Sequence, residues 1–183
     1  MDIINYDEIE KSLINNRKII TYYVEPIKMK YNNFDLNKNE GIYSFWYYNS
    51  NNKIQGLNRN LAIEGPNKIK LEINWDWNLN DEFVCLYIGK TRDFQKRVSQ
   101  HLLLKTNKLK NINGNQLYKK TTTCQLRSGF DYLYLNKNDN IKNELMEHIY
   151  LSLYYENDFV KRFYIEDYLI GKLRPWFNVD SER

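Results

Sequence analysis

The chain has 183 residues and a mass of 22.3 kDa, a size that predicts a single domain with insertions and enough length to bury a core. Its composition, 42% hydrophobic with 16 Tyr, 8 Phe and 4 Trp, excludes disorder throughout. No apolar run reaches the roughly 18 residues that span a bilayer, and the polar start of the chain lacks the pattern of a signal peptide, so we expect a cytoplasmic protein. Cys85 and Cys124 are too few for a disulfide framework or a cysteine-based zinc site.

Positive charge is concentrated in one segment. The whole chain carries a formal charge of +4, whereas residues 90–120 contain nine basic residues and the single acid Asp93. Such asymmetry is typical of a protein that binds a polyanion, and nucleic acid is the first candidate. A Lys-rich segment is also often a solvated surface, so charge alone leaves the question open.

The first half of the chain predicts a helix, an aromatic strand and an insertion. Asp2–Asn16 has the pattern of a short amphipathic helix, and Ile19–Val24, which is β-branched and aromatic, predicts a strand or a docking segment. Gly41–Tyr48 alternates enough and is aromatic enough to be a strand. Asn49–Asn80, with Asn, Gly and Pro around a possible strand at Ile69–Trp75, indicates an insertion.

The second half predicts two more strands, each followed by a helix. Phe83–Gly89 is a nearly continuous apolar run that ends in Gly, as expected of a central strand, and Ile149–Tyr155 is the third core strand. Helices are predicted over Asp93–Lys105, whose first residue can cap its amides, and over Asp158–Leu173, which Pro175 stops.

One acidic residue interrupts an apolar row on the last of these helices. The row consists of Phe159, Phe163, Glu166, Ile170 and Leu173, which share one helical face, and we expect this face to pack in the core. A carboxylate in such a row must be protonated, paired or bound to a metal, because an unpaired buried charge is costly. The alternative is a Glu at the rim of the core that pairs with a neighbouring Lys or Arg.

The other helix carries a basic pair among apolar neighbours. Its row is Phe94, Arg97, His101 and Leu104, so the guanidinium and the imidazole lie one turn apart on the same face. A single histidine at such a position is more often a satisfied, partly buried residue than a catalyst. The pair favours a functional interpretation.

The order and spacing of certain residues resemble a known family. In chain order the set is Gly41-Ile42-Tyr43, Tyr87-Ile88-Gly89, Lys90, Arg97, His101, Glu166 and Asn178. Arg97 lies ten positions after Tyr87, and His101 lies four further on. Glu166 begins the pattern E-x-x-L-I, and Asn178 follows a proline. From residue 41 to residue 178 the chain therefore resembles the GIY-YIG nuclease superfamily.

The resemblance implies a fold of the α/β class in its α+β form, a small antiparallel three-stranded sheet flanked by helices. It divides the chain into an N-terminal extension, 1–40, that packs on the core, and a nuclease domain, 41–183, with an insertion at about 49–80. Such insertions resemble the type II restriction endonucleases of this family. A nuclease of DNA repair or of a mobile element, a non-catalytic nucleic-acid-binding module, and RNA as the duplex are alternatives.

The resemblance also assigns the chemistry of phosphodiester hydrolysis. Glu166 would supply a hard oxygen ligand for Mg²⁺, with Mn²⁺ as a substitute, and Arg97 has the planar fork that matches a phosphate. Tyr43 resembles the family tyrosine proposed to activate water. A phenol with a pKa of about 10 is a poor base at neutral pH, so we expect a nearby cation, Lys90, to favour its phenolate. Tyr87 is the alternative base.

Supporting roles follow for two further residues. His101 either positions Tyr43 or accepts its proton, and Asn178 orders the loop next to the metal. Each chain carries one such constellation, so we expect a homodimer to cut both strands of a duplex. A restriction enzyme also implies a cognate methyltransferase.

Double-stranded DNA is the expected partner, held largely through its phosphates. Aromatic residues are sparse in the basic segment, which argues against a platform for stacking single-stranded bases. The candidate DNA contacts are Lys90, Arg92, Lys96, Lys105, Lys119, Lys120, Gln125 and Arg127.

Overall fold

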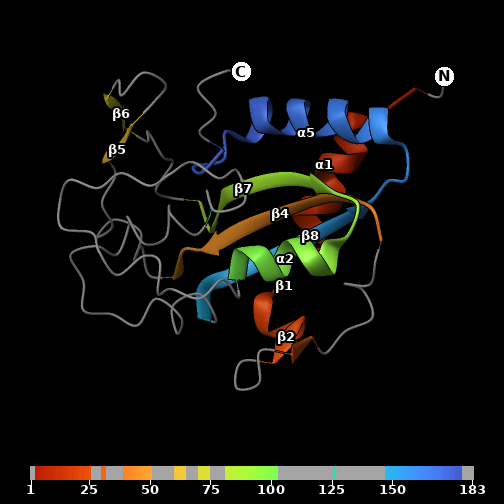
Figure 1. Cartoon of the computed structure of the whole chain (residues 1–183), viewed down its shortest axis with the longest axis horizontal. Helices are drawn as coiled ribbons and strands as arrows, with labels where there is room; N and C mark the ends of the chain where they lie inside the picture. The colour runs from red at the N-terminus through yellow and green to blue at the C-terminus, as the bar shows by residue number, and fades with distance from the viewer. Residues whose placement is uncertain are drawn as a thin grey trace.

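The computed structural model describes residues 3–25, 30–31, 39–50, 60–64, 70–74, 81–102, 126 and 147–178, and its fold is α+β (Figure 1). The elements in chain order are α1 (Tyr6–Asn15), β1 (Lys18–Ile19), η1 (Ile20–Tyr22), β2 (Val24–Glu25), β3 (Lys30–Tyr31), β4 (Gly41–Tyr48), β5 (Asn60–Glu64), β6 (Lys70–Asn74), β7 (Phe83–Thr91), α2 (Phe94–Leu102), β8 (Ile149–Tyr155) and α5 (Phe159–Leu173). Each helix and core strand predicted from the sequence has a counterpart in this series. Within the described residues, none of the helices has the length and apolar character needed to cross a bilayer.

The central sheet has four antiparallel strands in the order β1-β8-β4-β7. The three predicted core strands form its β8-β4-β7 part, with Tyr43 opposite Gly89 on one neighbour and opposite Leu153 on the other. The expected three-stranded sheet is corrected by β1, which pairs with the start of β8. Of the predicted Ile19–Val24 strand region only Ile19 extends the sheet, together with Lys18 before it, because η1 turns the chain away at Ile20.

Helices cover both faces of this sheet (Figure 1). On one face α1 and α5 bury Ile9, Leu13, Ile165 and Leu169 against a core that includes Trp46. On the other face α2 buries its own apolar row, Phe94 and Val98. Because side chains alternate along a strand, β4 directs its odd-numbered and even-numbered residues to these two different helical layers.

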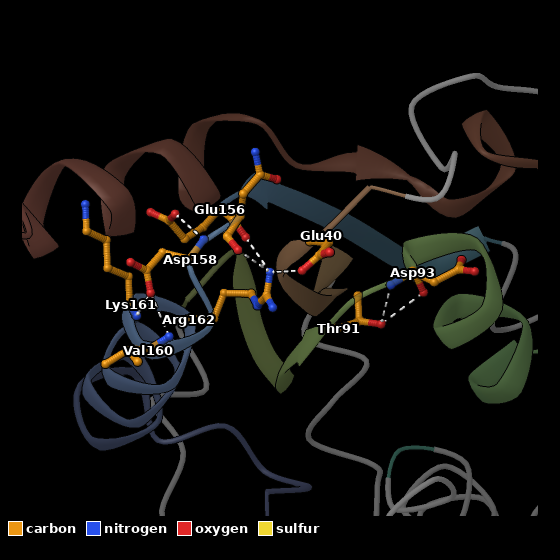
Figure 2. Close-up of polar contacts among 9 residues, drawn as sticks. Glu40, Thr91, Asp93, Glu156, Asp158, Val160, Lys161 and Arg162 are labelled. Atoms are coloured by element: carbon orange, nitrogen blue, oxygen red, sulfur yellow. Dashed lines mark hydrogen bonds and ion pairs between the residues drawn. The ribbon is translucent and has the colours of Figure 1, made fainter.

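The last helix begins and ends where the sequence predicts. Asp158 caps it, because its carboxylate accepts hydrogen bonds from the amides of Val160 and Lys161 at 2.7 and 3.0 Å (Figure 2). The helix ends at Arg174, which adopts a left-handed conformation with φ 44°, and Pro175 follows.

The predicted core stripe of α5 is right at Glu166, Ile170 and Leu173 but wrong at its first two members. Phe159 and Phe163 are 54% and 43% exposed, whereas the buried face consists of Arg162, Ile165, Glu166 and Leu169. The first turns of the helix bury Arg162 in place of these two phenylalanines, and the sequence pattern favoured the phenylalanines. Its guanidinium is buried because it pairs with Glu40 and with backbone carbonyls, which a sequence pattern does not reveal.

Two small sheets lie outside the central one. β5 pairs with β6, which confirms the strand predicted near Ile69–Trp75, and β2 pairs with β3. The rest of the expected 49–80 insertion lies largely outside the described residues. So does the end of the predicted Asp93–Lys105 helix, although the carboxylate of Asp93 does accept a hydrogen bond from the amide of Lys96 at 2.8 Å.

Candidate active site

A tyrosine, an arginine and a histidine meet between β4 and α2. Tyr43 is fully buried, and its hydroxyl accepts a hydrogen bond from Nε of Arg97 at 3.1 Å. The same hydroxyl lies 2.9 Å from Nε2 of His101. The spacing of four residues places Arg97 and His101 one turn apart, and both reach one oxygen on the facing strand.

Tyr87 joins this cluster from the neighbouring strand. Its ring stacks on that of Tyr43 with a centroid distance of 6.0 Å, and it lies 5.1 Å from the ring of His101. The antiparallel register of β4 and β7 brings the two tyrosines to the same face, although they are far apart in sequence. The two tripeptides that stood out in the sequence therefore meet in space.

Both glycines of those tripeptides are required by close packing. A Cβ atom on Gly89 would overlap the ring and hydroxyl of Tyr43. One on Gly41 would overlap the carbonyl oxygen of Tyr154 and the ring of Phe94. Gly89 thus leaves the space in which the tyrosine ring lies, and Gly41 allows β8 and α2 to approach the start of β4.

Burial governs protonation in this cluster. It raises the pKa of Tyr43 well above the ordinary value, an effect to which Tyr87 adds and which the positive charge of Arg97 opposes. Burial, followed by the charge of Arg97, lowers the pKa of His101 to about 3, so its imidazole is neutral at physiological pH. Since Arg97 already donates to the tyrosine oxygen, the hydroxyl proton is free to point at Nε2 of His101, which then acts as the acceptor.

Glu166 lies on the other side of the sheet, at its β7 edge. Its carboxylate accepts a hydrogen bond from the backbone amide of Lys90 at 3.1 Å and forms an ion pair with Nζ of the same residue. The expectation that Lys90 is the cation beside Tyr43 is therefore corrected: that cation is Arg97. The negative charge of Glu166 contributes to raising the pKa of Tyr87, after burial and against the opposing charge of Arg97, which links the two sides of the sheet.

Asn178 is hydrogen-bonded to the backbone of β7. Its side chain accepts from the amide of Ile88 at 2.8 Å and donates to the carbonyl of Ile88 at 2.7 Å. The preceding amides of Trp176 and Phe177 donate to carbonyls of β7. The residue expected to order a loop next to a metal is thus bonded to the β7 backbone two residues from Lys90.

The residues before β4 hold the starts of two helices. The carbonyl of Asn39 accepts from the amide of Phe94 at the start of α2, and the carbonyl of Glu40 accepts from the amide of Glu156. The carboxylate of Glu40 pairs with buried Arg162 of α5 (Figure 2). Sequence reasoning missed this tie, because its two members are 122 positions apart.

The donor set at Glu166 fits a magnesium ion with few protein ligands. Magnesium usually keeps several waters and takes one or two carboxylates plus phosphate oxygens, and Glu166 offers one carboxylate at the sheet edge. Within the described ranges, no three side chains of the types His, Cys, Asp and Glu gather into a metal-binding group. A metal held here would therefore rely on Glu166 and on its substrate, and it would replace Lys90 as the carboxylate's partner.

The candidate DNA contacts are only partly described. Lys90 lies near the end of β7, Arg92 directly follows that strand, and Lys96 is exposed on α2. Lys105, Lys119, Lys120, Gln125 and Arg127 lie outside the described residues.

Comparison with other proteins adds no relative. A scan against protein-family models, a search of curated proteins and a search of solved structures all find no match.

Proposed function

We propose that the chain is a metal-dependent endonuclease that hydrolyses phosphodiester bonds in double-stranded DNA. The observation that carries the proposal is the Tyr43 hydroxyl held between Nε of Arg97 at 3.1 Å and Nε2 of His101 at 2.9 Å. The hydroxyl oxygen of Tyr43 contacts both a permanent cation and a neutral imidazole. Such a site can transfer a proton next to a bound phosphate. The resemblance of the sequence to the GIY-YIG nucleases supports the same activity, and an antiparallel sheet flanked by helices is compatible with it.

The roles of the residues follow from their chemistry. The guanidinium of Arg97 is only half-buried and binds and stabilises the phosphate undergoing cleavage. Tyr43 accepts a proton from the attacking water in its phenolate form, which burial opposes and the charge of Arg97 favours. His101, with a pKa of about 3, orients the Tyr43 hydroxyl and does not take its proton. Glu166 would hold a divalent cation, Mg²⁺ or Mn²⁺, which would supply positive charge for the phosphate and the leaving oxygen.

Within this class we propose a type II restriction endonuclease. One constellation per chain supports a homodimer that cuts the two strands of a palindromic or near-palindromic site. Such an enzyme works beside a methyltransferase that protects the same site in host DNA.

Digestion of supercoiled plasmid tests the proposal. The parent chain with Mg²⁺ should convert the plasmid into discrete linear fragments, whereas Tyr43→Phe should be slower by about 10² to 10⁴, the usual contribution of general base catalysis. Tyr22→Phe, a change at an exposed tyrosine far from the cluster in sequence, is the matched control and should cut at the parent rate. Full activity of Tyr43→Phe, or no cutting by the parent of plasmids that together carry all short sequence motifs, contradicts the proposal.

A further inference from the structure

Exposed aromatic and aliphatic side chains gather around the start of α5. The described residues include seven large hydrophobic side chains that are exposed, and five of them lie within ten positions of one another. These five are Tyr155, Phe159, Val160, Phe163 and Tyr164. Scattered exposed hydrophobic residues need no explanation, but a contiguous group marks an interaction surface.

Two members of this group face the cations at the end of β7. Cζ of Arg92 lies 5.5 Å from the ring centroid of Phe159, and Nζ of Lys90 lies 4.5 Å from that of Phe163. The two rings are one turn apart on the same flank of the helix, about 6 Å along its axis. We call Phe159, Phe163, Lys90 and Arg92 the aromatic flank.

The aromatic flank is continuous with the candidate site. Lys90, which lies over Phe163, is also the ion-pair partner of Glu166. Glu166 follows Phe163 by three residues and therefore lies on a neighbouring part of the helix surface. A strand whose phosphate is held near Glu166 would extend along these rings.

The charge of the aromatic flank favours a negatively charged partner. Lys90 and Arg92 are positive, and the nearby carboxylate of Asp158 is used by the helix cap. The carboxylate of Glu166 pairs with Lys90, and a metal bound there would release Lys90 for a phosphate. Alternation of cations with flat aromatic faces suits phosphates together with bases, since every base has a face that stacks on an aromatic ring. The basic segment, residues 90–120, has few aromatic residues of its own. In the fold, α5 places Phe159 and Phe163 next to two of its cations.

We propose that the aromatic flank binds an unstacked base of the substrate strand, next to the phosphate held at the site. The inference rests on the proposed nuclease function and adds to it a preference for a strand with an accessible base. Within a duplex, a base must leave its stack before a ring can contact its face, so the flank would favour a frayed, flipped or single-stranded position next to the cut.

Fluorescence anisotropy with Ca²⁺ in place of Mg²⁺ tests the inference on the full chain. The probes are a short fluorescein-labelled DNA strand of mixed sequence and a strand of equal length without bases. The double variant Phe159→Ala/Phe163→Ala should bind the base-bearing strand about tenfold or more weakly than the parent, because each stacked base contributes that order of affinity. Its affinity for the abasic strand should change less than twofold.

Two further variants make the result specific. Val160→Ala/Tyr164→Ala removes neighbouring exposed side chains that lie about 100° further round the helix, so it should bind both strands as the parent does. Phe159→Leu/Phe163→Leu keeps apolar bulk without a flat face and should weaken binding to the base-bearing strand. Thermal melting confirms that each variant is folded, and the leucine variant decides the outcome if the alanine variant does not fold.

Other results overturn the inference in distinguishable ways. An equal loss of affinity for both strands means that the rings only support Lys90 and Arg92. Unchanged affinity for both strands means that the rings do not touch the strand. A lower mass of the alanine variant by light scattering, with unchanged affinity per chain, assigns the flank to a second copy of the protein. If the parent binds no nucleic acid and cuts none, the proposed function fails together with the inference.

Discussion

The two faces of the central sheet hold the candidate site in opposite ways. On the α2 face, Tyr43 and His101 are sealed, with exposed fractions of 0% and 1%, and their contacts are fixed by close packing. On the α5 face, Glu166 meets Lys90, whose side chain is 23% exposed, beside the open aromatic flank. The buried network therefore depends on volume and protonation, whereas the edge pair depends on charge and lies where a metal and a strand can approach.

The largest effect is expected at the open side. Glu166→Gln removes the negative charge with little change of shape, so cleavage of plasmid in Mg²⁺ should fall below detection. Binding of DNA in Ca²⁺ should remain largely intact, as measured by anisotropy. Asp167→Asn, a change of the same kind at the next, exposed residue, should keep the parent rate. Cleavage by Glu166→Gln near the parent rate would assign the carboxylate to stability alone.

Arg97 tests the sealed side through its geometry. Arg97→Lys keeps the charge but loses the fork that can donate to Tyr43 and to a phosphate at once, so it should be nearly as damaging as Arg97→Ala. A loss of about 10² or more in cleavage rate is expected for both variants, by analogy with the removal of one oxyanion donor. Equal rates for the lysine variant and the parent would limit Arg97 to an electrostatic role.

Volume distinguishes the two faces directly. Gly89→Ala should destabilise the protein by about 1–3 kcal/mol, because the added methyl overlaps Tyr43 in a packed interior. Gly171→Ala is the matched control on α5, where an added methyl meets nothing within 4 Å, and it should stabilise the protein by roughly 0.5–1 kcal/mol. Urea denaturation measures both, and equal stability of Gly89→Ala and the parent would show that the ring of Tyr43 can shift.

The sequence predicted the main elements and the shared face of Arg97 and His101, because both depend on local periodicity. Alternation and apolar runs located β4, β7 and β8, and the spacing of four placed Arg97 and His101 on one face. Packing between distant segments was not predictable in this way. The partner of Lys90 depends on how α5 lies against β7. Lys90, which was expected beside Tyr43, therefore pairs with Glu166 instead.

Arg162 shows why the orientation of α5 was missed. An arginine on an apolar face normally argues for exposure, but here Glu40 and the carbonyls of Glu156 and Asn157 satisfy it. The local sequence feature that bears most directly on the placement of α5 is the Asp158 cap. It determines where the helix begins but not which face is buried. For the same reason the sequence did not predict that Phe159 and Phe163 are exposed. Their exposure is what makes them available to a partner on the open face.

The last expected effect is a pH dependence of stability that belongs to the sealed side. His101 has a pKa of about 3 in the folded protein and about 6.5 when unfolded. Between these values the unfolded chain binds a proton that the folded chain does not, so the free energy of unfolding falls as the pH falls. From pH 6.5 to pH 5.0 this histidine should remove roughly 1.5 kcal/mol of stability.

His101→Gln isolates that contribution. Glutamine cannot gain the proton, so its unfolding free energy, measured in urea at several pH values, should fall less than that of the parent over the same interval. The interval stays above the usual pKa of carboxylates, which limits their share of the difference. Parallel curves for the two proteins would mean that the imidazole can charge in place, and the network around Tyr43 would then be open to water in the way that the Glu166 side is.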